Sequence, residues 1–366
     1  YILCGVLMNT GGIAQKLIDF AKILVGRIPG GLAHTNILGN TLFGSLSGSS
    51  VAASVAIGGV LIPMEEKEGY DKKFAAAVNI ASAPTGLIIP PSGILIIYPV
   101  LAGCSVVGMI MSGYIPGLMW ALACMVVAYV IAKKNHYPTA GKVPASVFFK
   151  YFVDAIPSLL LIVIIVGGVM SGIFTATESA AVAVAYTLFL SIVVYRSIKI
   201  KDLPKILLDA CETTAVIMFL IAGSNVMSFV MSFTGLPSAI GNALISVSSN
   251  KYVILLIINL VLLVVGCFMD ITPAVLIFTP IFLPVVQSFG MDPIHFGIMM
   301  VMNLGIGNIT PPVGSALFSG CSVADMDMED MIKPILPFYA AIFVALMLVA
   351  YVPWFSMALP TLFGAV

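Results

Sequence analysis

Charged residues are scarce in this sequence: only 9% of its 366 residues are Asp, Glu, Lys or Arg, whereas 60% are hydrophobic. A water-soluble chain of this length needs a charged surface, which such a composition does not supply. The net charge is zero, so the basic footprint of a nucleic-acid-binding protein is also missing. Apolar runs long enough to cross a hydrocarbon core of about 30 Å recur along the whole chain. The composition therefore predicts an all-α, polytopic protein embedded in a lipid bilayer.

Catalytic and metal-binding motifs are missing as well. The sequence contains neither the GxxxxGK[ST] phosphate loop nor the HExxH motif, so it encodes neither ATP hydrolysis of that type nor a metalloprotease mechanism. The six cysteines stand alone, without the paired spacing of a metal site. The chain begins at Tyr1 inside an apolar segment, and we expect a further N-terminal spanning region to precede it. These features favour a protein that is not an enzyme.

The basic residues indicate how the apolar segments are arranged. If residues 31–62 and 252–286 are re-entrant hairpins, fifteen of the sixteen Lys and Arg residues lie on one face of the membrane and only Lys251 lies on the other. An excess of Lys and Arg marks the cytoplasmic face. If either stretch spanned the membrane fully, this asymmetry would disappear. We therefore expect two hairpins, each of which enters and leaves the membrane on the same side.

An internal repeat relates the two halves of the chain at a constant offset of 221 residues. The shared residues are mostly glycine and proline, so the repeat preserves backbone geometry. Five predicted crossings separate equivalent points, and because this number is odd the two copies should be inverted. Inverted repeats with interrupted helices are typical of alternating-access transporters, although duplicated folds also occur in channels and membrane enzymes. The recurring residues are Pro63, Gly69, Asp71, Gly86, Ile88, Pro90, Pro91 and Gly93, matched by Pro284, Gly290, Asp292, Gly307, Ile309, Pro311, Pro312 and Gly314.

The hairpins and the helix breaks divide the chain into five predicted parts. Residues 1–30 form the end of a scaffold helix and an interfacial arm helix, and residues 133–235 form the central scaffold helices. The first repeat (31–132) contains a hairpin at 31–62 and a broken helix at 74–98, and the second repeat (236–334) contains a hairpin at 252–286 and a broken helix at 295–319. Residues 335–366 form a C-terminal transmembrane helix.

Each repeat contributes a polar hairpin tip and a doubled proline. Consecutive prolines cannot donate to the helix ladder, and they leave upstream carbonyls without partners. In hydrocarbon such groups need a partner from the protein or from a cavity. Free carbonyls and hydroxyls are hard oxygen ligands that suit Na⁺, and the half-helix N-termini after each break suit a carboxylate. The sequence therefore predicts one cation site in each repeat, with an anionic solute between them.

Five motifs resemble those of one transporter family. The sequence over essentially its whole length is similar to the large membrane subunit of tripartite ATP-independent periplasmic (TRAP) transporters. Ala176 stands where the family often has proline. The motifs are Leu7–Gly12, the tip Phe43–Ser50, the break Ile89–Ser92, the segment Gly172–Glu178 and the break Thr310–Gly314.

The resemblance implies more than the spacing does. TRAP large subunits are Na⁺-driven importers of organic anions in the bacterial inner membrane, and they work as elevators in which hairpins and broken helices move against a scaffold. They operate with a small four-helix membrane subunit and a periplasmic substrate-binding protein. Their substrates are mainly C4-dicarboxylates and sugar acids, including sialic acid. The tip Ser49–Ala52 lacks the Ala-Asp ending frequent in dicarboxylate members, which favours a sialic or other sugar acid.

Carried onto the matching positions, the resemblance places two or more Na⁺ ions and the solute among polar side chains and carbonyls. Among the intramembrane acids Asp270 is the strongest candidate because it lies at a tip, whereas Glu178 and Glu212 are either ligands or helix caps. The first Na⁺ site is expected at Ser45, Ser47, Gly48, Ser50, Pro90, Ser92 and Gly93, the second at Met269, Asp270, Thr272, Thr310, Pro312 and Gly314, and the solute at Asn40, Ser49, Thr85, Asp270, Asn308 and Thr310.

Other functions remain open at this point. A stand-alone divalent-anion/Na⁺ symporter would share the hairpins and breaks but would need no binding protein. A channel would pass current without a Na⁺ gradient. An intramembrane enzyme is the weakest alternative, because no catalytic constellation converges on one face.

Overall fold

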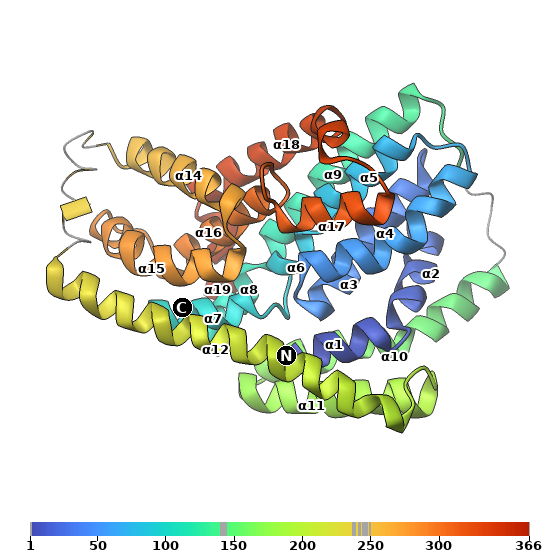
Figure 1. Ribbon diagram of the computed structural model, residues 1–366, viewed down its shortest axis with the longest axis horizontal. Helices are drawn as coiled ribbons and strands as arrows, with labels where there is room; N and C mark the ends of the chain where they lie inside the picture. Colours follow the sequence, from blue (N-terminus) through green and yellow to red (C-terminus); the bar gives the residue numbers. More distant parts are fainter. Residues whose placement is uncertain are drawn as a thin grey trace.

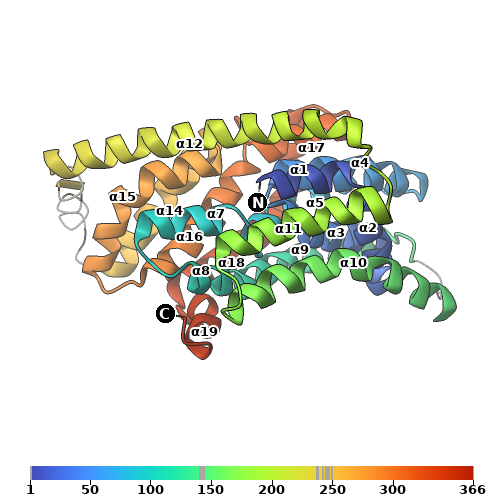
Figure 2. The same ribbon diagram turned by 90° about the horizontal axis from the view of Figure 1, so that it is seen from below.

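The computed structural model describes residues 2–139, 145–235, 239–240, 243, 248 and 250–365. Throughout that part of the chain the regular structure is helical, and seven helices are long and apolar enough to cross a membrane by length and composition. Figures 1 and 2 show an elongated bundle in which the long helices run broadly along the longest axis. The all-α prediction is confirmed.

The first half of the bundle consists of a hairpin followed by an interrupted helix. The hairpin turns at Gly48 and Ser49, and the interrupted helix is broken between Ile89 and Gly93. The elements are α3 (Gly31–Ser47) and α4 (Ser50–Lys67) for the hairpin, α5 (Lys72–Ser82), α6 (Thr85–Ile88) and α7 (Ile94–Ala102) for the interrupted helix, and then α8 (Val106–Ser112) and α9 (Tyr114–Lys134).

The second half repeats this order. Its hairpin turns at Met269 and Asp270, and its interrupted helix is broken between Ile309 and Gly314. The elements are α14 (Lys251–Phe268) and α15 (Ile271–Ser288), α16 (Pro293–Asn308) and α17 (Ser315–Ala324), and then α18 (Met328–Tyr351) and α19 (Trp354–Leu362).

The remaining helices lie along one side of the two halves (Figure 2). The short helix α2 packs against both α3 and α10, and Lys16 in α2 forms an ion pair of 3.5 Å with Asp154 in α10. It therefore links the flanking helices to the first hairpin. These elements are α1 (Ile2–Thr10), α2 (Ile13–Val25), α10 (Ala145–Met170), α11 (Ala176–Phe189) with the π-helical turn η1 (Leu190–Val194), the 3₁₀ turn η2 (Ile200–Asp202) and α12 (Leu203–Thr234).

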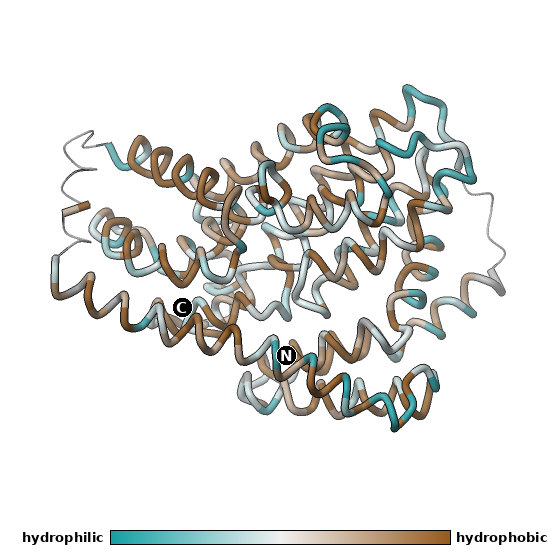
Figure 3. The backbone as a smooth tube through the Cα atoms, viewed as in Figure 1, coloured by the Kyte–Doolittle hydropathy of each residue, from teal (hydrophilic) through white to brown (hydrophobic). Residues whose placement is uncertain are grey.

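The two hairpins enter the bundle from opposite ends. In Figure 1 the pair α3–α4 comes from the right, the pair α14–α15 comes from the left, and their tips approach one another near the centre. Hydrophilic segments gather toward the right-hand end in Figure 3, whereas α12 and α14 are largely apolar. Large apolar side chains such as Phe219 and Phe233 of α12 are 79% and 87% exposed, as expected for helices that face lipid.

A contact between two glycines joins each hairpin to its interrupted helix. A Cβ atom on Gly86 would lie 2.2 Å from the Cα of Gly44, and one on Gly307 would lie 2.4 Å from the Cα of Gly266. No side chain fits at such a distance, so the two backbones touch directly. Gly86 and Gly307 are separated by the repeat offset of 221 residues, and each meets the last turn of its hairpin's first helix. The same packing therefore occurs in both halves.

The two interrupted helices differ at one point. In the first half the chain also breaks at Ala83 and Pro84, because Pro84 has no N–H to continue the helix. In a continuous helix the carbonyl of Ala81 would accept from the N–H of Thr85, whereas here it accepts a hydrogen bond of 2.8 Å from the indole Nε1 of Trp120. At the corresponding position of the second half the residue is Gly305, and α16 continues through it. This additional break is a finding of the structure, since the sequence predicts only the break at Pro90–Pro91.

Alanine at Gly86 or Gly307 should destabilise the fold, because its methyl group would overlap the backbone of the facing helix. We expect each substitution to lower the free energy of unfolding by about 1–3 kcal/mol, the usual cost of overpacking. Thermal unfolding of the purified protein in detergent measures the effect. Gly223→Ala is the matched control, because an added Cβ there meets nothing within 4 Å. Equal unfolding temperatures for Gly86→Ala and Gly223→Ala would show that the close contact is not needed.

Candidate functional site

The tip of the first hairpin places two helix ends side by side. Gly48 ends α3 in the left-handed conformation, with φ of 63°, which glycine adopts without strain. Ser49 then caps α4, and its hydroxyl accepts a hydrogen bond of 3.2 Å from the backbone N–H of Ala52. The carbonyl end of α3 and the N–H end of α4 therefore meet at this tip. The first attracts a cation and the second attracts an anion.

The first break lies directly against this tip. Gly48 packs on the backbone of Ser92 and Gly93, so that the tip and the break share one surface. The Ser92 side chain is completely buried, and its hydroxyl has no hydrogen-bond partner among the described residues. Both Pro90–Pro91 and Pro311–Pro312 are cis peptide bonds. An oxygen without a partner at the junction of tip and break is available to an ion or a water molecule.

The tip of the second hairpin carries a carboxylate. Asp270 occupies the N-cap of α15, but its side chain does not bond to that helix. Instead its Oδ1 accepts from the Nδ2 of Asn308 at 3.4 Å and from the hydroxyl of Ser315 at 3.1 Å. The amide oxygen of Asn308 accepts from the backbone N–H of Ala316 at 2.7 Å. Asp270 is thus held against the second break by residues on both sides of that break.

The second break is closed by groups from two other helices. The N–H of Val313 donates to the carbonyl of Cys267 in α14 at 3.2 Å. The hydroxyl of Tyr339 in α18 donates to the carbonyl of Ile309. In a continuous helix Ile309 would accept from Val313, so Tyr339 supplies the donor that the break removes. The hydroxyl of Thr310 donates back to the carbonyl of Ile306 at 2.6 Å.

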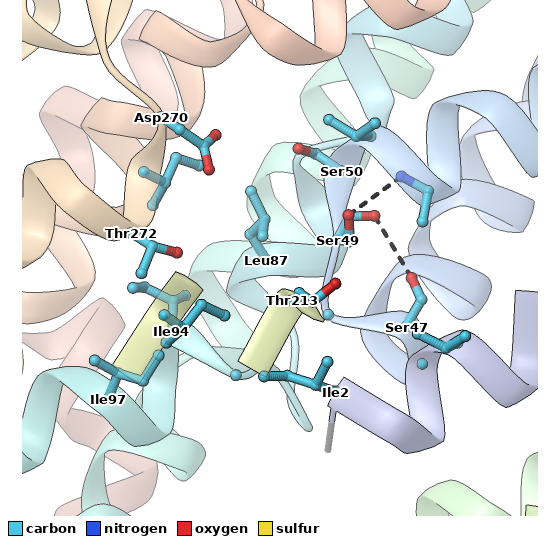
Figure 4. A pocket seen from close by; sticks show the side chains of 18 of the residues that line it. Ile2, Ser47, Ser49, Ser50, Leu87, Ile94, Ile97, Thr213, Asp270 and Thr272 are labelled. Carbon is cyan, nitrogen blue, oxygen red and sulfur yellow. Dashed lines mark hydrogen bonds between the residues drawn. The ribbon is translucent and has the colours of Figure 1, made fainter. Parts of the chain in front are cut away.

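A cavity of about 360 Å³ lies where the tips and breaks meet. Figure 4 shows Ser49 and Ser50 on one side of it, Asp270 and Thr272 on the other, and Thr213 and Ile2 along a third side. Its volume is in the range of pockets that hold small molecules. Asp270 is the one charged side chain among its described lining residues, and none of these residues is basic. A bound anion would therefore depend on helix N-termini, backbone N–H groups and hydroxyls.

The structure brings together part of the predicted site. The cavity wall includes most of the predicted tip residues and Asn308, but other predicted residues lie behind it. Those that line the cavity are Ser47, Gly48, Ser49, Ser50, Gly93, Asp270, Thr272 and Asn308, and those outside the wall are Asn40, Ser45, Thr85, Pro90, Ser92, Met269, Thr310, Pro312 and Gly314.

Two of the predicted solute ligands belong to a buried network instead of the cavity wall. The Nδ2 of Asn40 lies 3.0 Å from the Oδ1 of Asn79 and 3.0 Å from the hydroxyl oxygen of Ser82. The Thr85 hydroxyl donates to the carbonyl of Ser82 at 2.7 Å and lies 3.2 Å from the hydroxyl of Thr41. These contacts satisfy the polar groups inside the first half, between the hairpin and its interrupted helix. Their part in solute binding stays a prediction.

Some wall residues were missed by the sequence analysis. Thr213 and Ile217 reach the cavity from α12, and Gly5 reaches it from α1. Ser315, which bonds to Asp270, is the first residue of α17. Ser315 follows directly after the Pro-Pro-x-Gly break, a position that could have identified it. Thr213 gives no such signal, because its place in the wall depends on how α12 packs.

The two other acidic candidates do not line the cavity. Glu178 forms a capping box with Thr175, in which the N–H of Thr175 donates to the Glu178 carboxylate at 2.8 Å. This confirms the helix-cap interpretation of Glu178. Glu212 is exposed on α12. Within the described residues no group of three or more His, Cys, Asp or Glu side chains could hold a metal ion.

Two opposed hairpins, two interrupted helices and a cavity between them are typical of membrane transporters. The fold is similar to that of the YdaH transporter of Alcanivorax borkumensis, with a TM-score of 0.61 over 96% of this chain and 84% of that chain, at 13% sequence identity. At this low identity the likeness shows the fold alone.

The family is shown by sequence. Residues 1–355 match the family described as tripartite ATP-independent periplasmic transporter, DctM component, and the chain belongs to this family. It is therefore a TRAP large permease protein, a transporter and not an enzyme, and a multi-pass protein of the inner membrane.

Its relatives include proteins that are named for different substrates. The chain is 52% identical to the protein YgiK of Salmonella typhimurium over 100% of this chain and 84% of that protein. It is 39% identical to the C4-dicarboxylate large permease DctM of Pseudomonas aeruginosa, over 100% and 85% of the two chains. It is also 39% identical to the sialic acid large permease SiaM of Vibrio cholerae, over 99% and 85%.

Removal of the Tyr339 hydroxyl should weaken the second break. In Tyr339→Phe the carbonyl of Ile309 loses its donor, and a buried polar group without a partner costs about 1–3 kcal/mol. We expect the unfolding temperature to fall. Tyr129→Phe on α9 is the control, because the Tyr129 side chain is 38% exposed. A Tyr339→Phe protein as stable as the Tyr129→Phe protein would contradict this role of Tyr339.

Proposed function

We propose that this protein imports a small organic anion with Na⁺, and that a periplasmic binding protein delivers the solute to it. The observation that carries the proposal is the cavity between the two hairpin tips. Helix ends from both tips meet there, together with Asp270 and several hydroxyls. Carbonyl, hydroxyl and carboxylate oxygens are suitable ligands for a hard monovalent cation, and the N-terminal ends of helices suit a carboxylate.

Two cation positions fit this arrangement. The first lies at the first tip and break, where the carbonyl end of α3 meets the free hydroxyl of Ser92. The second lies near Asp270, at the second tip and break. Because basic side chains are missing from the described wall, bound Na⁺ would supply the positive charge that an anionic solute needs. This dependence of the anion on the cation is the physical basis of coupling.

The partners follow from the family. Its members are components of a tripartite system, so we propose a periplasmic binding protein and a small four-helix membrane subunit as partners. Relatives named for C4-dicarboxylate and for sialic acid are equally similar, at 39% identity, so overall identity does not distinguish the solute. The Ser49–Ala52 tip remains our reason to favour a sialic or other sugar acid.

The proposed movement is of the elevator type. The glycine contacts join each hairpin to its interrupted helix, which allows these elements to move as one body. The third side of the cavity comes from α1 and α12, which lie outside the two halves. Sliding of the hairpins and breaks past α1 and α12 would carry the solute across the membrane.

Uptake into proteoliposomes tests the coupling. With the binding protein and the small subunit present, we expect uptake to require a Na⁺ gradient. Asp270→Asn should raise the Na⁺ concentration for half-maximal uptake by roughly tenfold or more, as for a loss of about 1.4 kcal/mol of binding. Glu329→Gln, at an exposed position of α18 away from the cavity, should leave it unchanged.

The same assay separates the alternatives. Uptake of free solute without the binding protein would favour the stand-alone divalent-anion/Na⁺ symporter. Conduction without a Na⁺ gradient would favour a channel. An unchanged Na⁺ dependence in Asp270→Asn would exclude the second cation position.

Crosslinking tests the movement. Thr272 of the second tip and Thr213 of α12 both line the cavity (Figure 4). In a background without the six native cysteines, Thr213→Cys/Thr272→Cys joined by a cleavable bifunctional reagent should lose uptake, because the tip can no longer slide past α12. Reductive cleavage should restore uptake, and each single cysteine variant treated with the reagent is the control. Full uptake by the completely crosslinked protein would rule out this movement.

A further inference from the structure

A carboxyl group is buried at the base of the first hairpin, away from the cavity. Glu65 lies in the last turn of α4, outside the seven candidate spans, and its side chain is 0% exposed. Its neighbours Glu66 and Glu68 are exposed. Acidic side chains are almost never fully buried without a partner, so this position calls for an explanation.

The Glu65 carboxyl lacks the usual partners of a buried charge. Neither of its oxygens has a hydrogen-bond partner among the described residues, and the three ion pairs found in that part of the chain do not include it. The amide of Asn36 in α3 lies close enough to the carboxyl to favour its ionised form but forms no bond of normal geometry with it. An ionised carboxylate would be poorly stabilised here.

Hydrogen bonds determine which way the Asn36 amide faces. Its Oδ1 accepts from the Nδ2 of Asn40 at 2.8 Å. Asn40 in turn donates to Asn79, whose Nδ2 donates to the carbonyl of Ser54 at 2.9 Å. The Oδ1 of Asn36 is thus occupied within this buried network. The remaining polar atom of the amide is Nδ2, which has no hydrogen-bond partner and is available to donate. A neutral carboxyl can also accept from that N–H through its carbonyl oxygen while it keeps a proton on its other oxygen, so the Asn36 amide is compatible with a protonated Glu65.

The titratable groups around Glu65 do not provide a positive charge. The turn after α4 contributes Glu68, which repels a charge on Glu65, and Tyr70, whose pKa is raised to about 12 by burial. From α3 the additional group is His34, which is buried and whose pKa is lowered by burial, so its ring is neutral. The helices α2, α5, α6 and α17 also pack against α4. The two lysines at the start of α5 pair with other carboxylates, Lys72 with Glu66 at 3.9 Å and Lys73 with Asp330 at 2.6 Å. Among the described residues of these four helices no cation acts on Glu65.

We propose that Glu65, facing Asn36, is a proton-binding site in the base of the first hairpin, and that it holds its proton at neutral pH. The site is separate from the cavity and does not depend on the Na⁺ coupling proposed above. Loss of the proton would leave a charge buried beside Glu68, which would favour opening of the α3–α4 base to water.

The direction of the pH effect follows from the burial. Burial raises the pKa of Glu65 well above its ordinary value, with Glu68 acting in the same direction. The folded protein therefore binds this proton more tightly than the unfolded chain does. Its contribution to stability is fully present below the ordinary carboxyl pKa and is lost as the pH rises through the higher pKa of the folded state.

Infrared spectroscopy of the purified full chain at neutral pH detects the proton directly. A protonated carboxylic acid has a C=O stretching band that ionised carboxylates lack. We expect the wild-type band to lose one component in Glu65→Gln, which keeps the shape of the neutral acid. Glu66→Gln, the exposed neighbour on the same helix turn, should keep the full band. An identical band in wild type and Glu65→Gln would overturn the proposal.

Thermal unfolding at several pH values gives an independent measurement. The unfolding temperature of the wild type and of Glu66→Gln should fall as the pH is raised above the ordinary carboxyl range, and that of Glu65→Gln should fall less. Equal pH dependence in all three proteins would also overturn the proposal. If Glu65→Gln does not fold, Glu65→Asp serves in the infrared test. Because this substitution moves the carboxyl group, the C=O component assigned to Glu65 should shift. An unshifted band would contradict the assignment.

Discussion

Backbone polar groups inside a membrane need partners from the protein, and the whole arrangement of this molecule depends on that requirement. Each half contains a helix that stops in the middle of the bundle. The groups released by the interruption are bonded from elsewhere: Trp120 donates to Ala81, Tyr339 donates to Ile309, and Val313 donates to Cys267 of the facing hairpin. A helix can therefore end at the centre of the bundle only where other helices lie close enough to form hydrogen bonds with its released backbone groups.

This requirement also explains why the cavity has so few charged residues. A helix end carries about half an elementary charge in its unpaired N–H or C=O groups. The ends of α3, α4, α15 and the break before α7 converge on one small volume. Such ends attract ions without the desolvation cost of burying ionised side chains. Only Asp270 adds a full charge to the described part of the wall, and it is anchored by Asn308 and Ser315.

The hairpins and breaks could be predicted from sequence because glycine and proline act on the backbone locally. Gly48, Pro90 and Pro311 determine where helices end whatever packs around them. Partners that come from distant helices could not be predicted. Tyr339 and Thr213 are ordinary residues of apolar helices until the fold places one at a break and the other in the cavity wall.

The polar residues behind the cavity wall show a second limit on what can be predicted from sequence. Asn40 and Thr85 lie near the tip and break in sequence, yet the structure uses them to bond the hairpin to its interrupted helix. A polar residue in an apolar segment can serve a ligand or the interior equally well, and sequence alone does not separate these roles. The role of Glu178 could have been assigned from the sequence, because the Thr-x-x-Glu spacing from Thr175 is itself the local signal of a capping box.

The placement of Asp270 makes the two sides of the cavity electrically unequal. The second tip carries a negative charge, whereas the first presents only serine hydroxyls and backbone groups. Within the cavity, the second of the two proposed cations and the anion would therefore have different positions of lowest energy, the cation beside Asp270 and the anion toward Ser49 and the start of α4. The occupied cavity would hold an oriented pair of charges with a dipole along the line between the tips. Reversing that dipole would require moving the carboxylate to the other half of the chain.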